Sequence, residues 1–160
     1  MTTDKTSDDI VFPFTSPEEL DSYIPYLITR LANRWSSEQN KALADFDLQG
    51  AKMRVLSCLS SFDELTINEL SILSVTEQST TSRTVEQLVA AGLVERSISA
   101  KDQRVRTAKL TADGSKALKK IAPAVNDAYQ DLVRDTSAED LRICIKTLAK
   151  LLSNVKQNQI

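Results

Sequence analysis

The sequence has 160 residues, of which 41% are hydrophobic and 26% charged, with a net charge of −2, no histidine and three glycines. A chain of this length buries one good hydrophobic core, so we expect one domain, with or without appendages. The lack of histidine excludes Ser–His and Cys–His catalysis and the commonest zinc ligand, and so few glycines form no phosphate-binding loop; we expect no enzyme, no cofactor and no metal site.

Nothing in the sequence indicates a membrane or secreted protein. The longest purely apolar runs, such as residues 88–91, are far too short to span a bilayer, and the N-terminal stretch MTTDKTSDDI is acidic where a secretory signal is basic. We therefore expect a cytoplasmic protein. Cys58 and Cys144 are too few and too far apart for a disulfide scaffold. We expect Cys58 to be a small core residue and leave a redox role for either cysteine open.

Residues 1–46 are predicted to form an arm and a dimerisation helix. Residues 1–15 are polar and contain Pro13, so we expect a mobile arm. The helix begins with SPEE, in which Ser16 is the N-cap and Glu19 completes a capping box. It extends over residues 16–46, with a kink at Pro25. Its apolar residues follow a four-three-four-four spacing that predicts a seam for another helix: Leu20, Ile24, Leu27, Leu31 and Trp35.

The next segment predicts a helix-turn-helix. A helix from Asp47 to about Ser61 is followed by TINE, in which Thr66 and Glu69 form a second capping box before a short helix. After a break at residues 74–75, a further helix ends at Gly92, where we expect a left-handed cap. The residues expected to face inward are Ala51, Val55, Leu59 and Phe62 in the first of these helices, Ile67, Leu70 and Leu73 in the second, and Thr81, Val85 and Leu88 in the third.

A β-hairpin is predicted directly after this motif. The segments LVERSI (93–98) and RVRTAKL (104–110) contain β-branched residues and flank the polar turn SAKDQ. A hairpin in this place makes residues 47–110 a winged helix-turn-helix.

Residues 111–160 are predicted to form two dimerisation helices. Thr111 caps the first, which runs to about Arg134 with a kink at Pro123, and Ser137 with Asp140 begins the second. The second helix has a coiled-coil-type seam formed by Leu141, Ile145, Leu148, Leu152 and Val155. The fold class is thus mostly α with a small β-hairpin wing, flanked by N- and C-terminal dimerisation helices. We expect a homodimer, the alternative being a monomer whose two ends pack together.

Charge and side-chain pattern both indicate double-stranded DNA as the partner. Residues 96–120 contain eight basic and two acidic residues, so this segment carries +6 and the remainder −8. A locally positive region suits a polyanion, although a solvated charged face would look the same. On the helix after residue 76, small hydroxyl side chains and one arginine lie opposite the apolar face, where they could bind phosphates and base edges. Arginines of the wing could enter the minor groove. The predicted DNA-binding residues are Thr76, Ser79, Thr80, Ser82, Arg83, Asp102, Arg104 and Arg106, with capping as the alternative for Thr76.

These residues resemble the MarR family of bacterial transcription regulators. The resemblance rests on SR..EQL..AGLVER (82–96), DQR (102–104) and LTADG (110–114), and in helix layout it extends over residues 16–158. It implies a homodimer that places a helix in the major groove and a wing in the minor groove of a pseudo-palindromic operator. By this resemblance Arg83 is the recognition-helix arginine and Arg104, beside Asp102, the wing-tip arginine.

The resemblance also implies regulation by a ligand. Many relatives repress nearby genes and release DNA when a small aromatic effector occupies a cleft between the dimerisation and DNA-binding parts. Trp35 and Met53 are our candidates for such a pocket, with a plain core role as the alternative. Thr81 and Thr84 depart from the family, which usually has aliphatic residues there, so the recognition helix could pack less firmly or be adapted to another DNA sequence. The rival function is a winged-helix module that binds a protein partner and no DNA.

Overall fold

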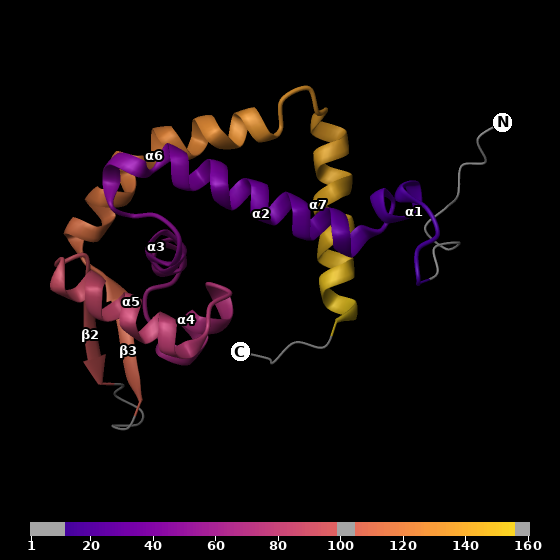
Figure 1. The fold of residues 1–160 in the computed structure, drawn as a ribbon. Helices are drawn as coiled ribbons and strands as arrows, with labels where there is room; N and C mark the ends of the chain where they lie inside the picture. The colour runs from indigo at the N-terminus through magenta and orange to yellow at the C-terminus, as the bar shows by residue number, and fades with distance from the viewer. Residues whose placement is uncertain (1–11, 99–104, 156–160) are drawn as a thin grey trace.

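The computed structural model describes residues 12–98 and 105–155 and confirms a mostly helical fold with a small antiparallel sheet (Figure 1). In chain order its elements are α1 (Pro17–Asp21), α2 (Ile24–Ala42), the 3-10 helix η2 (Ala44–Phe46), α3 (Ala51–Ser61), β1 (Leu65–Thr66), α4 (Ile67–Leu73), α5 (Gln78–Ala90), β2 (Val94–Ile98), β3 (Arg106–Leu110), α6 (Ala112–Leu132) and α7 (Ala138–Asn154). In this part of the chain no helix is both long and apolar enough to cross a membrane.

The first predicted helix is divided in two. Ser16 caps α1 by accepting a hydrogen bond from the Glu19 amide at 3.3 Å, as predicted, but the Glu19 carboxylate accepts from the Thr15 amide at 2.7 Å. Where we expected a kink, the helix breaks after Asp21 and α2 starts at Ile24. Pro25 then lies in a first helical turn, where its missing N–H costs nothing. Residues 1–11 of the predicted arm lie outside the described residues.

The helix-turn-helix consists of α3, α4 and α5. The predicted capping box is confirmed, since the Thr66 amide donates to the Glu69 carboxylate at 2.7 Å and the Glu69 amide to Thr66 Oγ1 at 3.1 Å. The helix expected from Asp47 instead begins at Ala51, because Asp47 and Gly50 have φ angles of 50° and 58° that no α-helix allows. The expectation for Phe62 was wrong: it follows the end of α3 in extended backbone and is 48% exposed.

The sheet has three strands in the order β1-β3-β2, one more than predicted. The expected hairpin is present as β2 and β3, which pair antiparallel from Val94 opposite Leu110 to Ile98 opposite Arg106. The unpredicted strand β1 pairs with β3 through Leu65 opposite Ala108. A strand of two residues is too short to show an alternating pattern, so it could not be predicted.

The hydrophobic core lies entirely in the winged helix-turn-helix and the parts of the chain beside it. Figure 1 shows α6 running alongside α2, above α3, with which it is also in contact, while α7 descends from the far end of α6. Neither α2 nor α7 contains a buried residue, and most residues of their predicted seams are exposed to solvent in the single chain. The buried hydrophobic residues are Leu43, Leu48, Met53, Val55, Leu56, Leu59, Leu65, Leu70, Val85, Leu88, Val94, Ala108 and Ile121.

Candidate nucleic-acid interface

Helix α5 turns a polar face to solvent, as its periodicity predicts. Its inner face is formed by Thr81, Val85 and Leu88, each at most 1% exposed. Ser79, Thr80 and Arg83 are exposed on the outer side, whereas Ser82 is half-buried on the flank. Gln78, which the sequence analysis passed over, is also exposed at the first helical position. The sequence could have identified the Gln78 side-chain amide as a candidate DNA contact, because the first turn of a recognition helix is the part nearest a phosphate.

Thr76 differs from the other predicted contacts, since its hydroxyl is engaged within the protein. Its Oγ1 lies 2.7 Å from Ser74 Oγ and 2.7 Å from Thr81 Oγ1. It is also not the N-cap of α5: that position belongs to Glu77, which makes no capping hydrogen bond with its side chain.

The two threonines that depart from the family pattern are well packed. Thr81 is fully buried and Thr84 is 6% exposed. The Thr81 hydroxyl has partners in Thr76 and in the Glu77 carbonyl oxygen, at 2.7 and 3.1 Å. A buried hydroxyl that keeps its hydrogen bonds carries no large desolvation penalty. Threonine in place of an aliphatic residue therefore does not loosen this face of α5.

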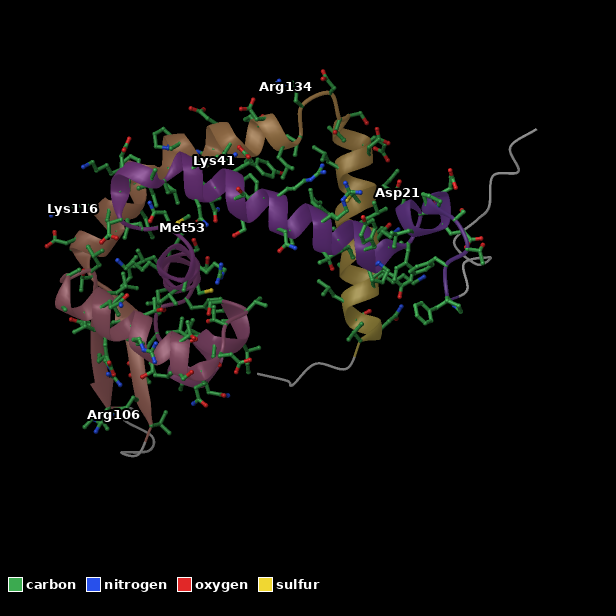
Figure 2. The ribbon with its side chains drawn as sticks, in the orientation of Figure 1. Asp21, Lys41, Met53, Arg106, Lys116 and Arg134 are labelled. Atoms are coloured by element: carbon green, nitrogen blue, oxygen red, sulfur yellow. The ribbon has the colours of Figure 1, made fainter. Side chains whose placement is uncertain are left out.

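The wing presents a basic edge. Arg106 is exposed at the first residue of β3, and together with Arg96, Ser97 and Ile98 it lines a shallow hollow. Figure 2 shows Arg106 at the end of the strands that is remote from α6. The other two predicted wing residues, Asp102 and Arg104, lie outside the described residues.

Ion pairs reduce the free positive charge of the basic segment. Arg96 pairs with Glu86 of α5 at 3.4 Å, Lys109 with Glu95 at 2.5 Å and Lys116 with Asp113 at 2.8 Å. Within residues 12–98 and 105–155, neither Arg83 nor Arg106 forms an ion pair. Positive charge thus remains available at the two places where recognition helix and wing would meet a polyanion.

Two contacts that the sequence analysis missed fix this surface. The Arg54 side chain of α3 donates from Nε to the Ser74 carbonyl at 2.9 Å and so holds the turn before α5. The ion pair between Arg96 and Glu86 joins β2 to α5. No local sequence signal identifies either contact, because each joins residues that only the tertiary fold brings together.

Comparison with known proteins identifies the family. A model of the MarR family matches residues 48–105, which include α3, β1, α4, α5 and β2. A MarR family transcriptional regulator from Silicibacter pomeroyi is 49% identical, with a TM-score of 0.82 over 89% of this chain and 94% of that chain. The chain belongs to the MarR family. A second MarR family regulator from that organism is 33% identical, with a TM-score of 0.80 over 88% of this chain and 95% of its own.

MarR family proteins are DNA-binding transcription regulators and not enzymes. A MarR variant from E. coli in complex with operator DNA is 26% identical to this chain, with a TM-score of 0.71 over 81% of this chain and 94% of that one.

In the present MarR family member, the described residues contain no group of three or more His, Cys, Asp or Glu side chains able to hold a metal ion.

The two pocket candidates of this MarR family chain lie in different cavities. Met53 lines a cavity of about 600 Å³ between the end of α3 and α6, together with Lys119 and Asn126. Trp35 lines a cavity of about 650 Å³ between α2 and α6. The structure therefore does not bring the two residues to one site, and Met53, only 8% exposed, belongs to the core.

Cys58 of this MarR family chain is half-buried against the core and Cys144 is exposed. Burial raises the pKa of the Cys58 thiol, an effect that the nearby Arg54 partly offsets. A raised pKa lowers the fraction of reactive thiolate at neutral pH. This agrees with the predicted packing role of Cys58.

Proposed function

We propose that the protein is a homodimeric repressor that binds a pseudo-palindromic operator sequence-specifically and is released by a small aromatic effector. Helix α5 enters the major groove and the wing the minor groove. The observation that carries the proposal is the outer face of α5, where Arg83 is exposed without an ion pair in the described structure, among the small hydroxyl side chains of Ser79 and Thr80. The MarR relative in complex with operator DNA supports the same use of the fold.

The dimer is supported by apolar side chains that the single chain leaves uncovered. On α2, Leu27 and Leu31 are 44% and 52% exposed, and on α7, Ile145 and Leu152 are 64% and 59% exposed. Residues at this spacing form the seam of packed helices. A second copy of the chain would cover them and bring two α5 helices to one side of a duplex, with half-sites about 34 Å apart.

Effector release is supported by the cavity beside Met53. It has a volume of about 600 Å³, within the range of small-molecule sites, and lies between the winged helix-turn-helix and α6. Apolar walls from Leu118 and Val125 suit an aromatic ring, and Lys119 suits an acidic substituent. Thermal shift and operator release by benzoate-like compounds would test this part of the proposal.

Fluorescence-anisotropy titration with an operator selected from a random duplex pool tests DNA binding. Arg83→Gln should weaken binding at least about thirtyfold and change base preference, because the dimer has two such arginines and one bidentate arginine–guanine pair contributes about 1–3 kcal/mol. Arg106→Gln should weaken binding to all sequences and lower the salt slope by about 2 per dimer.

Arg134→Gln is the matched control, since it removes the same charge at the far end of α6, away from the wing (Figure 2). Unchanged affinity in both Arg83→Gln and Arg106→Gln would overturn the DNA-binding assignment to these surfaces. Absence of any DNA shift at physiological salt would instead favour the protein-interaction module.

A further inference from the structure

Three hydroxyl groups form a connected network across the turn between α4 and α5. We call Ser74, Thr76 and Thr81 the hydroxyl network. Ser74 Oγ donates to the Leu70 carbonyl at 2.6 Å, Ser74 and Thr76 are 2.7 Å apart, and Thr76 and Thr81 are 2.7 Å apart. Thr81 also approaches the Glu77 carbonyl at 3.1 Å. The network therefore connects the last turn of α4 to the first turn of α5.

Counting protons fixes the direction of these hydrogen bonds. Each hydroxyl has one proton, so three protons serve four contacts. If Ser74 donates to the Leu70 carbonyl, then Thr76 must donate to Ser74, and Thr81 must donate to Thr76. This order satisfies the three contacts of 2.6 to 2.7 Å, and Thr81 shares its proton between Thr76 and the Glu77 carbonyl at 3.1 Å. The only proton of Thr76 is consequently committed to Ser74, and none is free for a phosphate oxygen.

The turn that the network spans needs such support. Val75, the residue between Ser74 and Thr76, has a φ of 52°, a left-handed conformation that is unfavourable for a β-branched side chain. Its side chain is 84% exposed and gains nothing from burial. Helix α5 also starts without a side-chain cap. The turn is held by the Thr76 amide bonded to the Ser71 carbonyl at 3.0 Å, by Arg54 and by the hydroxyl network.

We propose that Thr76 is a positioning residue for the recognition helix and not a DNA contact. By joining Thr81 to Ser74 it fixes the first turn of α5, and with it the direction of Ser79 and Arg83. This inference rests on the proposed use of α5 in DNA binding. It gives Thr76 a role different from the direct contact expected from the sequence.

The test is a double-mutant cycle on operator affinity, at a temperature where circular dichroism shows every variant folded. Thr76→Val and Thr81→Val each keep side-chain shape but remove a hydroxyl, and each should weaken binding by the dimer about thirtyfold, the effect of one net hydrogen bond of about 1 kcal/mol in each subunit. Thr76→Ser keeps the hydroxyl and should bind the operator with wild-type affinity. Because Thr81 is fully buried and cannot touch DNA, its effect reports positioning alone.

The combined variants separate positioning from contact. Thr76→Val should add little in the Thr81→Val background, since both changes break the same connection. Thr80→Val removes an exposed hydroxyl on the same helix. Its effect on operator affinity should be independent of Thr81→Val, so the two fold losses should multiply. In the free protein, amide exchange over residues 76–82 should become faster in Thr76→Val and stay unchanged in Thr80→Val.

The inference is overturned if Thr76→Val causes the same loss of affinity in both backgrounds, which marks a direct DNA contact. It is also overturned if Thr76→Val has no effect while Arg83→Gln weakens binding. Unchanged binding by Arg83→Gln would overturn the proposed use of α5, a separate result. If Thr76→Val does not fold, Thr81→Val is measured alone and together with Thr76→Ser. The inference then requires that Thr81→Val weakens operator binding, and unchanged binding overturns it.

Discussion

Gly114, at the start of α6, lies against the backbone that leads into the wing. A Cβ at this position would be 2.1 Å from the Leu93 carbonyl oxygen and 2.7 Å from Leu110 Cδ1. Carbon and oxygen atoms in ordinary contact are about 3.3 Å apart, so alanine requires a displacement of about 1 Å. The Leu93 carbonyl cannot move freely, because it accepts the Thr111 amide at 3.1 Å. We therefore expect Gly114→Ala to destabilise the protein.

Two opposing effects set the magnitude. Overpacking costs about 1–3 kcal/mol and loss of the Thr111 hydrogen bond about 1 kcal/mol. Replacing a helical glycine by alanine returns about 1 kcal/mol through helix propensity. The net expectation for Gly114→Ala is a loss of about 2 kcal/mol in the free energy of unfolding. For a chain of this size that corresponds to a fall in Tm of about 4–8 °C.

Urea unfolding followed by circular dichroism, at one fixed protein concentration, measures this change. Ser115→Ala is the control, because it alters the next residue of the same helix, gains propensity and introduces no new atom near Leu93. It should be as stable as wild type or slightly more so. If Gly114→Ala is as stable as wild type, helix propensity outweighs the contact and the reasoning from the close approach is refuted.

Three further changes probe local features. Thr66→Ala removes the capping box of α4 and should cost about 1 kcal/mol in urea unfolding, whereas Thr66→Ser should not; equal stability of the two would contradict this. Val75→Asn relieves a left-handed β-branched residue and should raise Tm by about 2–4 °C, and a lower Tm would argue against backbone strain there. Leu148→Asp should weaken the dimer about a thousandfold in sedimentation, since about 2 kcal/mol of burial is lost per subunit. Thr147→Asp, off the seam, should leave the dimer intact, and equal dissociation would exclude the predicted seam.

Features encoded by short-range chemistry could be predicted from the sequence. The caps at Ser16, Thr66, Thr111 and Ser137 were all recognisable, because each side chain accepts from an amide three residues later. The inner face of α5 and the left-handed Gly92 likewise follow from local periodicity and backbone preference.

Features that depend on contacts between distant segments could not be predicted. Strand β1 exists only because Leu65 meets Ala108 of β3, and the close approach of Gly114 to Leu93 requires the packed hairpin. The contact of Thr76 with Thr81, five residues later, was also not predicted, because it depends on the geometry of the turn between α4 and α5. The exposed contacts Ser79, Thr80 and Arg83 follow from helical geometry, but their binding to DNA stays a prediction.

The 21 residues of α6 form a helix about 30 Å long, and Pro123 lies inside it, where proline removes one helical hydrogen bond. The N-terminal end of α6 is held at the start of the wing by two hydrogen bonds of Thr111. Its amide donates to the Leu93 carbonyl at 3.1 Å and its hydroxyl to the Gly92 carbonyl at 2.7 Å. Rotating the part of α6 before Pro123, about 17 Å long, by about 5° at the proline moves the start of the wing by about 1.5 Å. A displacement of this size is about half the length of a hydrogen bond, so a small rotation at Pro123 would change the position of the wing.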